Sequence, residues 1–393
     1  MPLNCIELKN MRASRIRPVF LLFAVVPAIL YFGLQPRGYD FTNAVQRLED
    51  RPGLRFDRHG IAYADRLPPI VTEEFSIEIA IKPDNRPHRG FNLILLFHGG
   101  DDRTQLLMGQ WQSQIILMNG DDYRHKRRLP RISFDTSRVN AREMLVTATS
   151  GPKGTQIFVN GELLASKENM MLRIPRKSDG GIRLVIGNSV YGRHSWTGEI
   201  YGLALYQNIV SEQEIAERFR RWDSKAGFPD DAGGANPDLL YLFDESGDRT
   251  IHEHAGRASP LRIPERFTVL KGKFLSFQIV NFDNLRDPIF DICINTFGFI
   301  PIGFLFALVL RVAGGRFVRF SLLGAVFAGF LLSLSIETAQ AWLPSRHSSA
   351  LDLSFNTLGT FAGAWAGIKK LELRAPSADG GFSRGRKRSK ALD

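Results

Sequence analysis

The chain has 393 residues, enough for two or three domains with a sizeable core. Its mean hydropathy is near neutral, -0.12, but this average combines a polar middle with apolar ends. The net charge of +11 would suit a nucleic-acid-binding protein, yet the basic residues cluster beside the apolar segments as membrane topology requires. This distribution argues against a nucleic-acid partner and for a membrane protein.

The first apolar segment runs from Val19 to Leu34 and follows several basic residues, among them Arg15 and Arg17. A basic segment before an apolar run is also the pattern of a cleavable signal peptide. No small-residue cleavage pattern follows, because the sequence continues GLQPRGYDF. We therefore predict a cytoplasmic tail over 1–17 and an uncleaved transmembrane helix over 18–34.

Three more apolar segments lie near the C-terminus, at 289–310, 317–340 and 351–368, and each approaches the roughly 20 residues that span a bilayer. Four basic residues precede the first span, three lie between the second and third spans or at the very start of the third, and eight follow the fourth. The loop between the third and fourth spans contains one Lys or Arg residue, Arg346. The positive-inside rule then places both termini, including a basic tail over 371–393, in the cytoplasm and the long middle region outside.

The middle region, residues 50–275, consists of short runs of alternating apolar and polar residues between turns, such as FSIEIAIKP and FNLILLFHG. This pattern predicts antiparallel strands. Asn160-Gly161 between two such runs predicts a tight hairpin, and Ser211 with Glu214 predicts a capped helix ending near Trp222. We expect a multi-domain protein with an all-β jelly-roll sandwich and a bundle of four transmembrane helices. Cysteines fall only in the N-terminal tail and a span, so no disulfide is expected in the sandwich.

Three segments of the middle region carry a family resemblance: EEFSIEIAIKPDN, GTQIFVNGELLAS and WTGEIYGLALYQNIVSEQEIAERF. They resemble an early strand, the central hairpin and the closing segment of laminin-G-like or concanavalin A-like jelly rolls. The resemblance covers about residues 53–225 and implies carbohydrate binding. Residues 237–256 resemble the strand with which many such domains begin, and we expect this segment to complete the sandwich in permuted order.

The sequence of the sandwich gives few signs of a catalytic, sugar-binding or metal site. Glucanase-type jelly rolls have paired carboxylates in an E-x-D-x-x-E pattern, which this sequence lacks, so we expect no catalysis there. Trp111 or Trp196 could stack on a sugar ring, although an aromatic residue on a strand more commonly belongs to the core. Acidic turn residues could bind Ca²⁺, or could simply be solvated. These are Asp101, Asp102, Asp121 and Asp122.

The three C-terminal spans carry polar residues at helical spacing near their expected outer ends. They are Asp291 and Asn295 in the second span, Ser333, Glu337 and Gln340 in the third, and Asp352 and Asn356 in the fourth. Ionisable groups at membrane depth are costly unless they are paired or wet, so they normally face the bundle interior or a water-filled cavity. We therefore predict one shared polar binding site, open to the outside.

The charges in this site leave several uses open. The carboxylates could hold a cation or act as acid and base on a phosphate-bearing lipid. In our interpretation Arg346 binds an anionic group, while Glu337 and Asp352 are ion or proton partners. Asn295, Gln340 and Asn356 would orient the ligand by hydrogen bonds. The alternative is an arginine–carboxylate network that only ties the helices together.

The spacing of these residues carries a second family resemblance. The pattern is Asp291, Asn295, Gly298, Phe299, Pro301 and Gly303, then Ser333, Glu337, Gln340, Pro344, Arg346, Ser348, Asp352, Asn356 and Gly359. It resembles the VanZ-like family across the membrane region 286–370. The resemblance implies a multi-pass protein of the bacterial inner membrane and cell envelope, in a family whose name-giving members are associated with teicoplanin resistance. Members usually have their first two helices close in sequence, whereas more than 200 residues separate them here.

These patterns support three functional hypotheses. In the first, the helices handle or recognise an envelope glycan or lipid-linked precursor at the outer face of the membrane, and the sandwich binds sugar. In the second, the chain is a membrane-anchored carbohydrate-binding module whose helices are purely structural. The third, transport, has less support because four spans leave little room for a pathway. Membrane lipid is an expected partner in each.

Overall fold

A computed structural model describes most of the chain. The described residues are 5–34, 42–67, 72–84, 90–176, 181–224, 228, 236–245, 247, 249–276, 286–314, 318, 320–343, 346 and 348–373. The chain divides into two compact units. Gly38–Gly272 forms one, and Met1–Arg37 together with Lys273–Asp393 forms the other.

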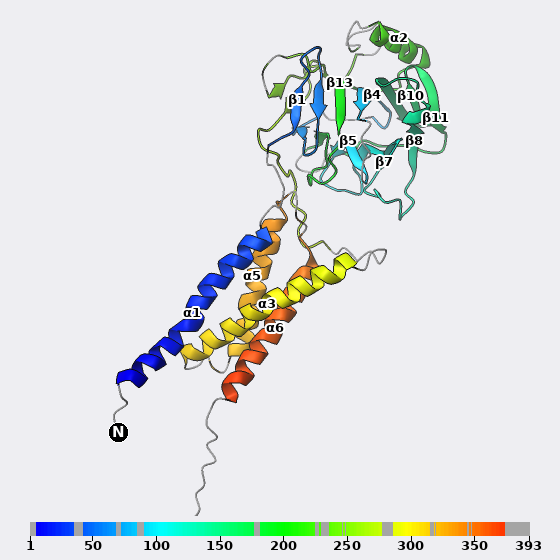
Figure 1. Cartoon of the computed structure of the whole chain (residues 1–393). Coiled ribbons are helices and arrows are strands. Elements are labelled where there is room, and N and C mark those ends of the chain that lie inside the picture. Colours follow the sequence, from blue (N-terminus) through cyan, green and yellow to red (C-terminus); the bar gives the residue numbers. More distant parts are fainter. Residues whose placement is uncertain are drawn as a thin grey trace, which may run out of the picture. The chain divides into compact units, whose positions relative to one another are not determined.

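The first unit is a sandwich of two antiparallel sheets (Figure 1). The first sheet has the order β1 (Val45–Arg47), β2 (Leu54–Phe56), β13 (Gly198–Tyr206), β4 (Phe75–Pro83), β9 (Met144–Gly151), β10 (Gly154–Val159) and β11 (Glu162–Lys167), with β14 (Leu239–Tyr241) also paired to β13. The second sheet has the order β15 (Thr250–Ile251), β16 (Leu261–Arg262), β3 (Ala62–Ala64), β12 (Arg183–Ile186), β5 (Asn92–His98), β6 (Leu106–Trp111), β7 (Gln114–Asn119) and β8 (Arg131–Asp135). The all-β sandwich expected from the sequence is confirmed.

The sandwich has three apolar layers instead of one. The main core lies between the sheets and includes Trp196, which is fully buried. A second cluster lies on the outer face of the first sheet under α2 (Glu212–Asp223), and a third includes loop residues on the outer face of the second sheet. Strands such as β4 and β9 are therefore buried on both faces, although their sequences alternate.

Local signals in the sequence place the sandwich connections. Asn160 and Gly161 have φ values of 54° and 81° in the β10–β11 turn, which confirms the expected hairpin. Ser211 and Glu214 form the expected capping box at the start of α2. The segment after α2 contributes β14 to the first sheet, where Leu203 pairs with Tyr241, and β15 to the second. Residues 237–256 thus take part in both sheets.

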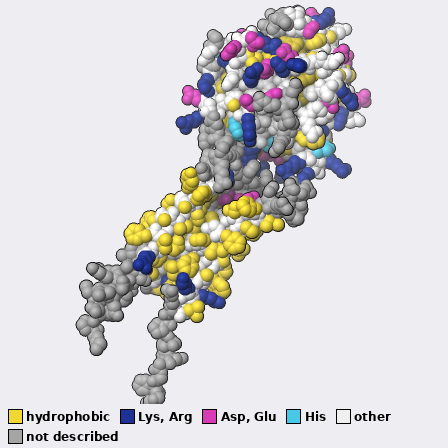
Figure 2. All heavy atoms as spheres, in the orientation of Figure 1, with side chains coloured by type: hydrophobic (Ala, Val, Ile, Leu, Met, Phe, Trp, Pro, Cys, Tyr) yellow, Lys and Arg dark blue, Asp and Glu magenta, His cyan; other side chains and the backbone are white. Residues whose placement is uncertain are grey.

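The second unit consists of the helices α1 (Cys5–Leu34), α3 (Arg286–Ala313), α5 (Ser321–Gln340) and α6 (Ala350–Glu372) (Figure 1). In the described part of the chain, three segments are long and apolar enough to cross a membrane: Arg17–Leu34, Ile289–Ala313 and Ser321–Gln340. Four spans were expected, and α6 is not among the three that qualify. Figure 2 shows hydrophobic side chains over the helical unit and charged ones of both signs over the sandwich.

The composition of α6 reflects how it packs. Gly359, Gly363 and Gly367 recur every four residues and face α3. A Cβ atom on Gly363 would overlap the carbonyl oxygen of Ile300, and one on Gly359 would overlap that of Thr296. Small residues at this spacing let two helix backbones approach closely, as in membrane helix pairs. Asp352 and Asn356 lower the hydropathy of α6 most, and the nearly neutral glycines add little to it, so α6 falls short of a span by composition while it is fully helical.

Candidate functional site

Glu337, near the end of α5, sets the start of α6. Its side chain is buried, with 1% of its surface exposed. One carboxylate oxygen accepts a hydrogen bond of 2.7 Å from the backbone N–H of Ser349, the residue that caps α6. A carboxylate is stabilised at a helix N-terminus by the free N–H groups and the helix dipole. Glu337 therefore fixes the geometry of the α5–α6 turn.

Three polar side chains from α3 and α6 meet beside this turn. Asn295 donates a hydrogen bond of 2.8 Å from Nδ2 to Oδ1 of Asp352, which is half-buried. Asp291 lies one turn before Asn295 on α3, is exposed, and is close enough for its charge to act on Asp352. Two carboxylates and an amide thus converge on one partly open position.

A further polar pair lies one turn along the helices. Asn356 donates from Nδ2 to the hydroxyl of Ser333 over 2.9 Å, and both side chains are buried. The amide oxygen of Asn356 is buried and has no hydrogen-bond partner within the described part of the chain. A buried acceptor without a partner is costly, so this position can accept one more donor.

Gln340 and Arg346 contact α1. Gln340 donates from Nε2 to the carbonyl of Gly33 over 2.8 Å, and Arg346 donates from Nη2 to the carbonyl of Phe32 over 3.2 Å. The last carbonyls of a helix lack partners within the helix, so these side chains supply a cap for α1. Both residues were predicted from the sequence to bind a ligand, and in the structure they also fasten the end of α1.

Two serines belong to the turn although no role was expected for them. Ser348 is fully buried, and its hydroxyl and carbonyl accept hydrogen bonds from the backbone N–H groups of Leu275 and Ser276, each over 3.0 Å. Ser349 caps α6 through the N–H groups of Leu351 and Asp352. A serine just before an apolar helix is the signal that could have identified Ser349.

The cluster of Asp291, Asn295 and Asp352 is suited to polar ligands. Its carboxylates can accept hydrogen bonds from hydroxyl groups or pair with an ammonium group or a metal cation, and the amide can orient such a ligand. Because the cluster lies at one end of an apolar helical unit, these groups are more strongly attractive than in bulk water. A cluster of this chemistry is suited to a polar group next to an apolar one.

The sandwich has a separate polar cleft of about 560 Å³. It is lined by the ends of β2 and β4, the start of β13 and the turn after β8. Glu199 lies in its wall and accepts hydrogen bonds from Arg55 over 2.5 Å and from Tyr201 over 2.7 Å, with Lys82 at 3.4 Å. Burial alone would raise the pKa of Glu199, but these donors and charges hold it below its usual value.

The rest of the cleft lining mixes hydrogen-bond donors and acceptors. Polar lining residues include Asp57, Asp84, Thr136, Ser137, Asn140 and Arg142. Thr136 donates through its N–H and hydroxyl to the carbonyl of Ser113, in the turn that follows Trp111. Trp111 itself is 47% exposed, whereas Trp196 is buried and donates to Gln110 over 2.7 Å. The two tryptophans therefore differ: Trp196 belongs to the core, and Trp111 is available to a ligand.

The four acidic turn residues considered for Ca²⁺ take separate partners. Asp101 accepts from the N–H of Arg103, and Asp121 pairs with Arg127. Asp102 and Asp122 are each bound by several donors from the protein. Among the residues described, a different group of three has its ligand atoms within 4.8 Å of one another. It consists of Asp244, Glu245 and His254.

Two family models match the chain. Residues 240–369 match the VanZ/LLP1 model, and residues 59–216 match a laminin-G model described as the concanavalin A-like lectin/glucanases superfamily. The helical region is VanZ-like, and the sandwich is laminin-G-like. Both resemblances inferred from the sequence are thereby confirmed. The VanZ-like match begins at residue 240, within the sandwich, and so includes most of β14, then β15, β16, α3, α5 and most of α6.

Solved structures with low identity also resemble part of this chain. A candidate carbohydrate-binding protein from Bacteroides ovatus is 16% identical with a TM-score of 0.39, covering 56% of this chain and 61% of that one. Trypanosoma rangeli sialidase in complex with sialic acid is 17% identical with a TM-score of 0.36, covering 46% and 29%. The receptor binding domain of botulinum neurotoxin D is 15% identical with a TM-score of 0.35, covering 47% of each chain.

The match spans less than two thirds of the length of each of these solved structures. No curated protein matches the chain.

Proposed function

We propose that this VanZ-like protein recognises a glycan or lipid-linked glycan precursor of the bacterial cell envelope at the outer face of the inner membrane. The observation that carries the proposal is the partly open cluster of Asp291, Asn295 and Asp352 at one end of the helical unit. A VanZ-like membrane region joined to a carbohydrate-binding type of jelly roll fits a membrane glycan-binding protein. In this proposal α6 is a fourth span, both termini are cytoplasmic, and the sandwich is outside.

The helical cluster would bind the part of the ligand nearest the bilayer. Sugar hydroxyls donate to Asp291 and Asp352, and Asn295 keeps Asp352 oriented toward them. Glu337 acts indirectly, because it fixes the start of α6 and with it the position of Asp352. The buried acceptor on Asn356 provides one more site for a donor.

The sandwich would bind the sugar chain in the cleft that contains Glu199. Its volume of about 560 Å³ lies within the range of small-molecule sites. Sugars carry hydroxyl groups that both donate and accept, which suits a lining with Ser137, Asn140, Arg142 and Glu199. The exposed ring of Trp111 offers an apolar face of the kind on which sugar rings stack.

A retention experiment tests the proposal. Full-length protein in lipid nanodiscs is incubated with envelope lipid fractions, and retained molecules are identified by mass spectrometry. Asp352→Asn should lower retention of a glycan-bearing lipid at least tenfold, because one bidentate charged acceptor is lost. Glu162→Gln, on the exposed strand β11, is the control and should retain as much as the wild type.

Equal retention by the Asp352→Asn variant and the wild type would contradict the proposal. In cells, deletion of the gene is expected to alter glycopeptide sensitivity. The same variant should fail to restore wild-type sensitivity to the deletion strain. A retained lipid of unchanged mass indicates binding, whereas a changed mass indicates that a bond is made or broken.

A second candidate function is a membrane-anchored carbohydrate-binding module with a structural helical unit. The fastening contacts of Gln340 and Arg346 to α1 favour it. In that case Asp352→Asn would be tolerated, while Asn140→Ala with Arg142→Ala in the cleft would abolish glycan binding. The two variants measured side by side separate the two functions.

A further inference from the structure

The connection between β7 and β8 forms a basic loop, residues 121–130. Five consecutive residues at its tip are exposed: Arg124, His125, Lys126, Arg127 and Arg128. The two acidic residues of the loop offset only part of the charge of this tip, and one oxygen of Asp122 lies 4.0 Å from His125. Asp121 pairs with Arg127, and Asp122 is buried beneath the loop. Arg124 and Arg128 have no acidic partner in the part of the chain that the structure describes.

The basic loop is held in a defined conformation by Asp122. Its carboxylate accepts hydrogen bonds from the backbone N–H groups of Arg127 over 3.3 Å and Leu129 over 3.1 Å. Burial would raise the pKa of Asp122, but these N–H groups and the charge of Arg131 hold it below its usual value. The loop therefore keeps its central anion across the physiological pH range.

Backbone conformation points the same way. His125 and Arg128 have φ values of 53° and 52°, in the left-handed region that side chains seldom adopt. Such positions persist only where the surrounding structure enforces them, and they occur frequently at binding sites. The backbone that carries these cationic side chains is therefore held in a fixed conformation by its surroundings.

The basic loop lies beside the turn between β5 and β6. Gly120 donates to the carbonyl of Gln105 over 2.9 Å, and Gln105 donates from Nε2 to the hydroxyl of Tyr123 over 2.8 Å. These contacts join the start of the loop to the residue just before β6. The basic loop and the β5–β6 turn therefore lie at the same end of the second sheet.

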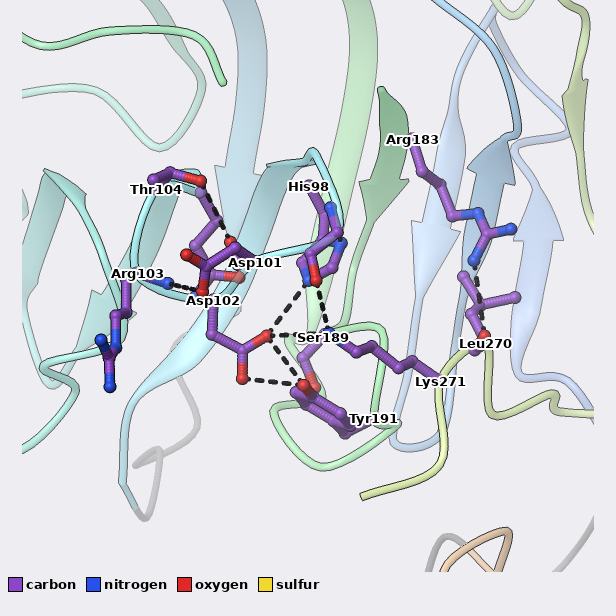
Figure 3. A network of polar contacts seen from close by, with 12 residues as sticks. His98, Asp101, Asp102, Arg103, Thr104, Arg183, Ser189, Tyr191, Leu270 and Lys271 are labelled. Atoms are coloured by element: carbon purple, nitrogen blue, oxygen red, sulfur yellow. Dashed lines mark hydrogen bonds and ion pairs between the residues drawn. The ribbon is translucent and has the colours of Figure 1, made fainter. Parts of the chain in front are cut away.

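The chain leaves the sandwich toward α3 at this same end. Lys271 donates to the carbonyl of Gly100 in the β5–β6 turn over 2.7 Å and lies 3.6 Å from Asp102. Asp102 is held in turn by the hydroxyl of Tyr191 at 2.7 Å and by His98 at 3.1 Å (Figure 3). The exit segment is thereby fixed against the turn that also supports the basic loop.

Chain length keeps this end of the sandwich within reach of a bilayer. About 15 residues connect Lys271 to the start of α3, and a fully extended connection of that length spans at most about 50 Å. A surface held by a short tether to its partner meets that partner at a high effective concentration. The cleft with Glu199, in contrast, involves Thr136 after β8 and lies at the other end of the β7 and β8 strands.

We propose that the basic loop binds the anionic phospholipid headgroups of the membrane that contains the protein's own helices. Guanidinium groups match phosphodiester oxygens in charge and geometry. Each basic residue near an anionic surface strengthens the attraction roughly 5-fold. A bilayer is favoured over a soluble polyanion because the tether keeps the bilayer within a limited distance and the five residues at the tip are all exposed.

Energy transfer in nanodiscs tests the proposal on the full chain. Thr104, exposed in the β5–β6 turn, is replaced by cysteine for a donor dye after Cys5→Ser and Cys293→Ser, and the acceptor is a labelled lipid. Transfer should be higher in phosphatidylcholine discs that contain phosphatidylglycerol than in phosphatidylcholine alone. It should fall in 1 M salt, where the Debye length is about 3 Å.

Arg124→Gln with Arg128→Gln should lower the docked-to-undocked ratio roughly 30-fold in the anionic discs. Lys153→Gln with Arg220→Gln removes the same charge from other exposed positions of the sandwich and should leave the ratio unchanged. Thermal melting of both variants should match the parent protein, because all four side chains are exposed.

Equal transfer in the two kinds of disc would overturn the proposal, as would an equal loss in the control variant. Soluble polyphosphate provides a separate comparison. If the Arg124 and Arg128 substitutions weaken polyphosphate binding but leave energy transfer unchanged, the loop binds a soluble phosphodiester polymer and the membrane proposal is wrong.

Discussion

The sandwich and the helical unit bury polar groups in different ways. In the sandwich, Glu78 of β4 and Arg218 of α2 form a fully buried ion pair of 3.9 Å, to which Thr147 and Tyr206 add hydrogen bonds. In the helical unit, the amides of Asn356, Asn295 and Gln340 pair with a hydroxyl, a carboxylate and a backbone carbonyl, and the ion pair of Arg311 with Glu372 is exposed at Glu372. The sandwich stabilises buried charge with opposite charge, whereas the helices rely on close backbone approach and single hydrogen bonds.

The largest effect is expected from adding a methyl group between α3 and α6. Gly363→Ala should prevent assembly of the helical unit, because the new Cβ would overlap the carbonyl oxygen of Ile300. Gly298→Ala is the control, since its Cβ would meet nothing within 4 Å, and alanine favours a helix by up to about 1 kcal/mol. Size-exclusion chromatography and thermal melting in detergent measure both. Similar melting of the two variants would mean that close glycine packing does not hold this unit together.

The second prediction breaks the buried ion pair of the sandwich. Arg218→Met should destabilise the sandwich by about 3–5 kcal/mol at pH 8, because it leaves the Glu78 carboxylate buried without its counter-charge. Arg221→Met, in an exposed pair with Glu217 on the same helix, should cost about 0–1 kcal/mol. Calorimetry of the sandwich transition compares them. The double change Glu78→Met with Arg218→Met should restore most of the lost stability, and a failure to do so would assign the loss to packing.

The third prediction uses the pH dependence of the same pair. Burial raises the pKa of Glu78 to about 7, against an ordinary value of 4.5, despite the charge of Arg218 and the hydrogen bond from Thr147. The folded state therefore binds more protons, so the free energy of unfolding should fall as pH rises from about 4.5 to about 7. The expected decrease is on the order of 3 kcal/mol. Glu78→Gln should remove it, and calorimetry that shows the same slope in the variant would assign the slope to other groups.

The smallest effect is expected for a single polar contact in the helical unit. Ser333→Ala removes the acceptor for Asn356 and should cost about 1 kcal/mol, the scale measured for hydrogen bonds between membrane helices. Ser335→Ala is the matched control, because that hydroxyl is exposed and bonds within its own helix to Leu331. Thermal melting in detergent decides. A loss for Ser333→Ala as large as that for Arg218→Met would remove the contrast between the two regions.

Much of the fold could be predicted because its signals are local. The Asn160-Gly161 turn needs positive φ, and the Ser211–Glu214 box satisfies free N–H groups, so both act within a few residues. The three layers of the sandwich could not be predicted. An alternating sequence predicts a strand with one exposed face, whereas here α2 and the loops cover that face. A fourth span was expected over 351–368, but Asp352 and Asn356 keep the hydropathy of α6 below that of the three segments that qualify.

The polar residues of the candidate site could be found from sequence, but their partners could not. Helical spacing indicated that Asn295 and Asp352 face inward, and they are hydrogen-bonded. The contact of Gln340 with α1 joins residues 307 positions apart, with the whole sandwich between them in the chain. Such a contact depends on how α1 packs against α5, which no local pattern encodes. Their roles in ligand binding stay predictions.

The α5–α6 turn contacts both segments through which the chain passes between the sandwich and the helices. Gln340 and Arg346 hold the end of α1, and Ser348 holds Leu275 and Ser276. A pull on the chain at either of these points therefore also loads this turn. The turn also carries Glu337, which anchors the start of α6. Tension along either connection would therefore be shared between the end of α1 and the start of α6, which makes the turn a natural place to measure force with an optical trap.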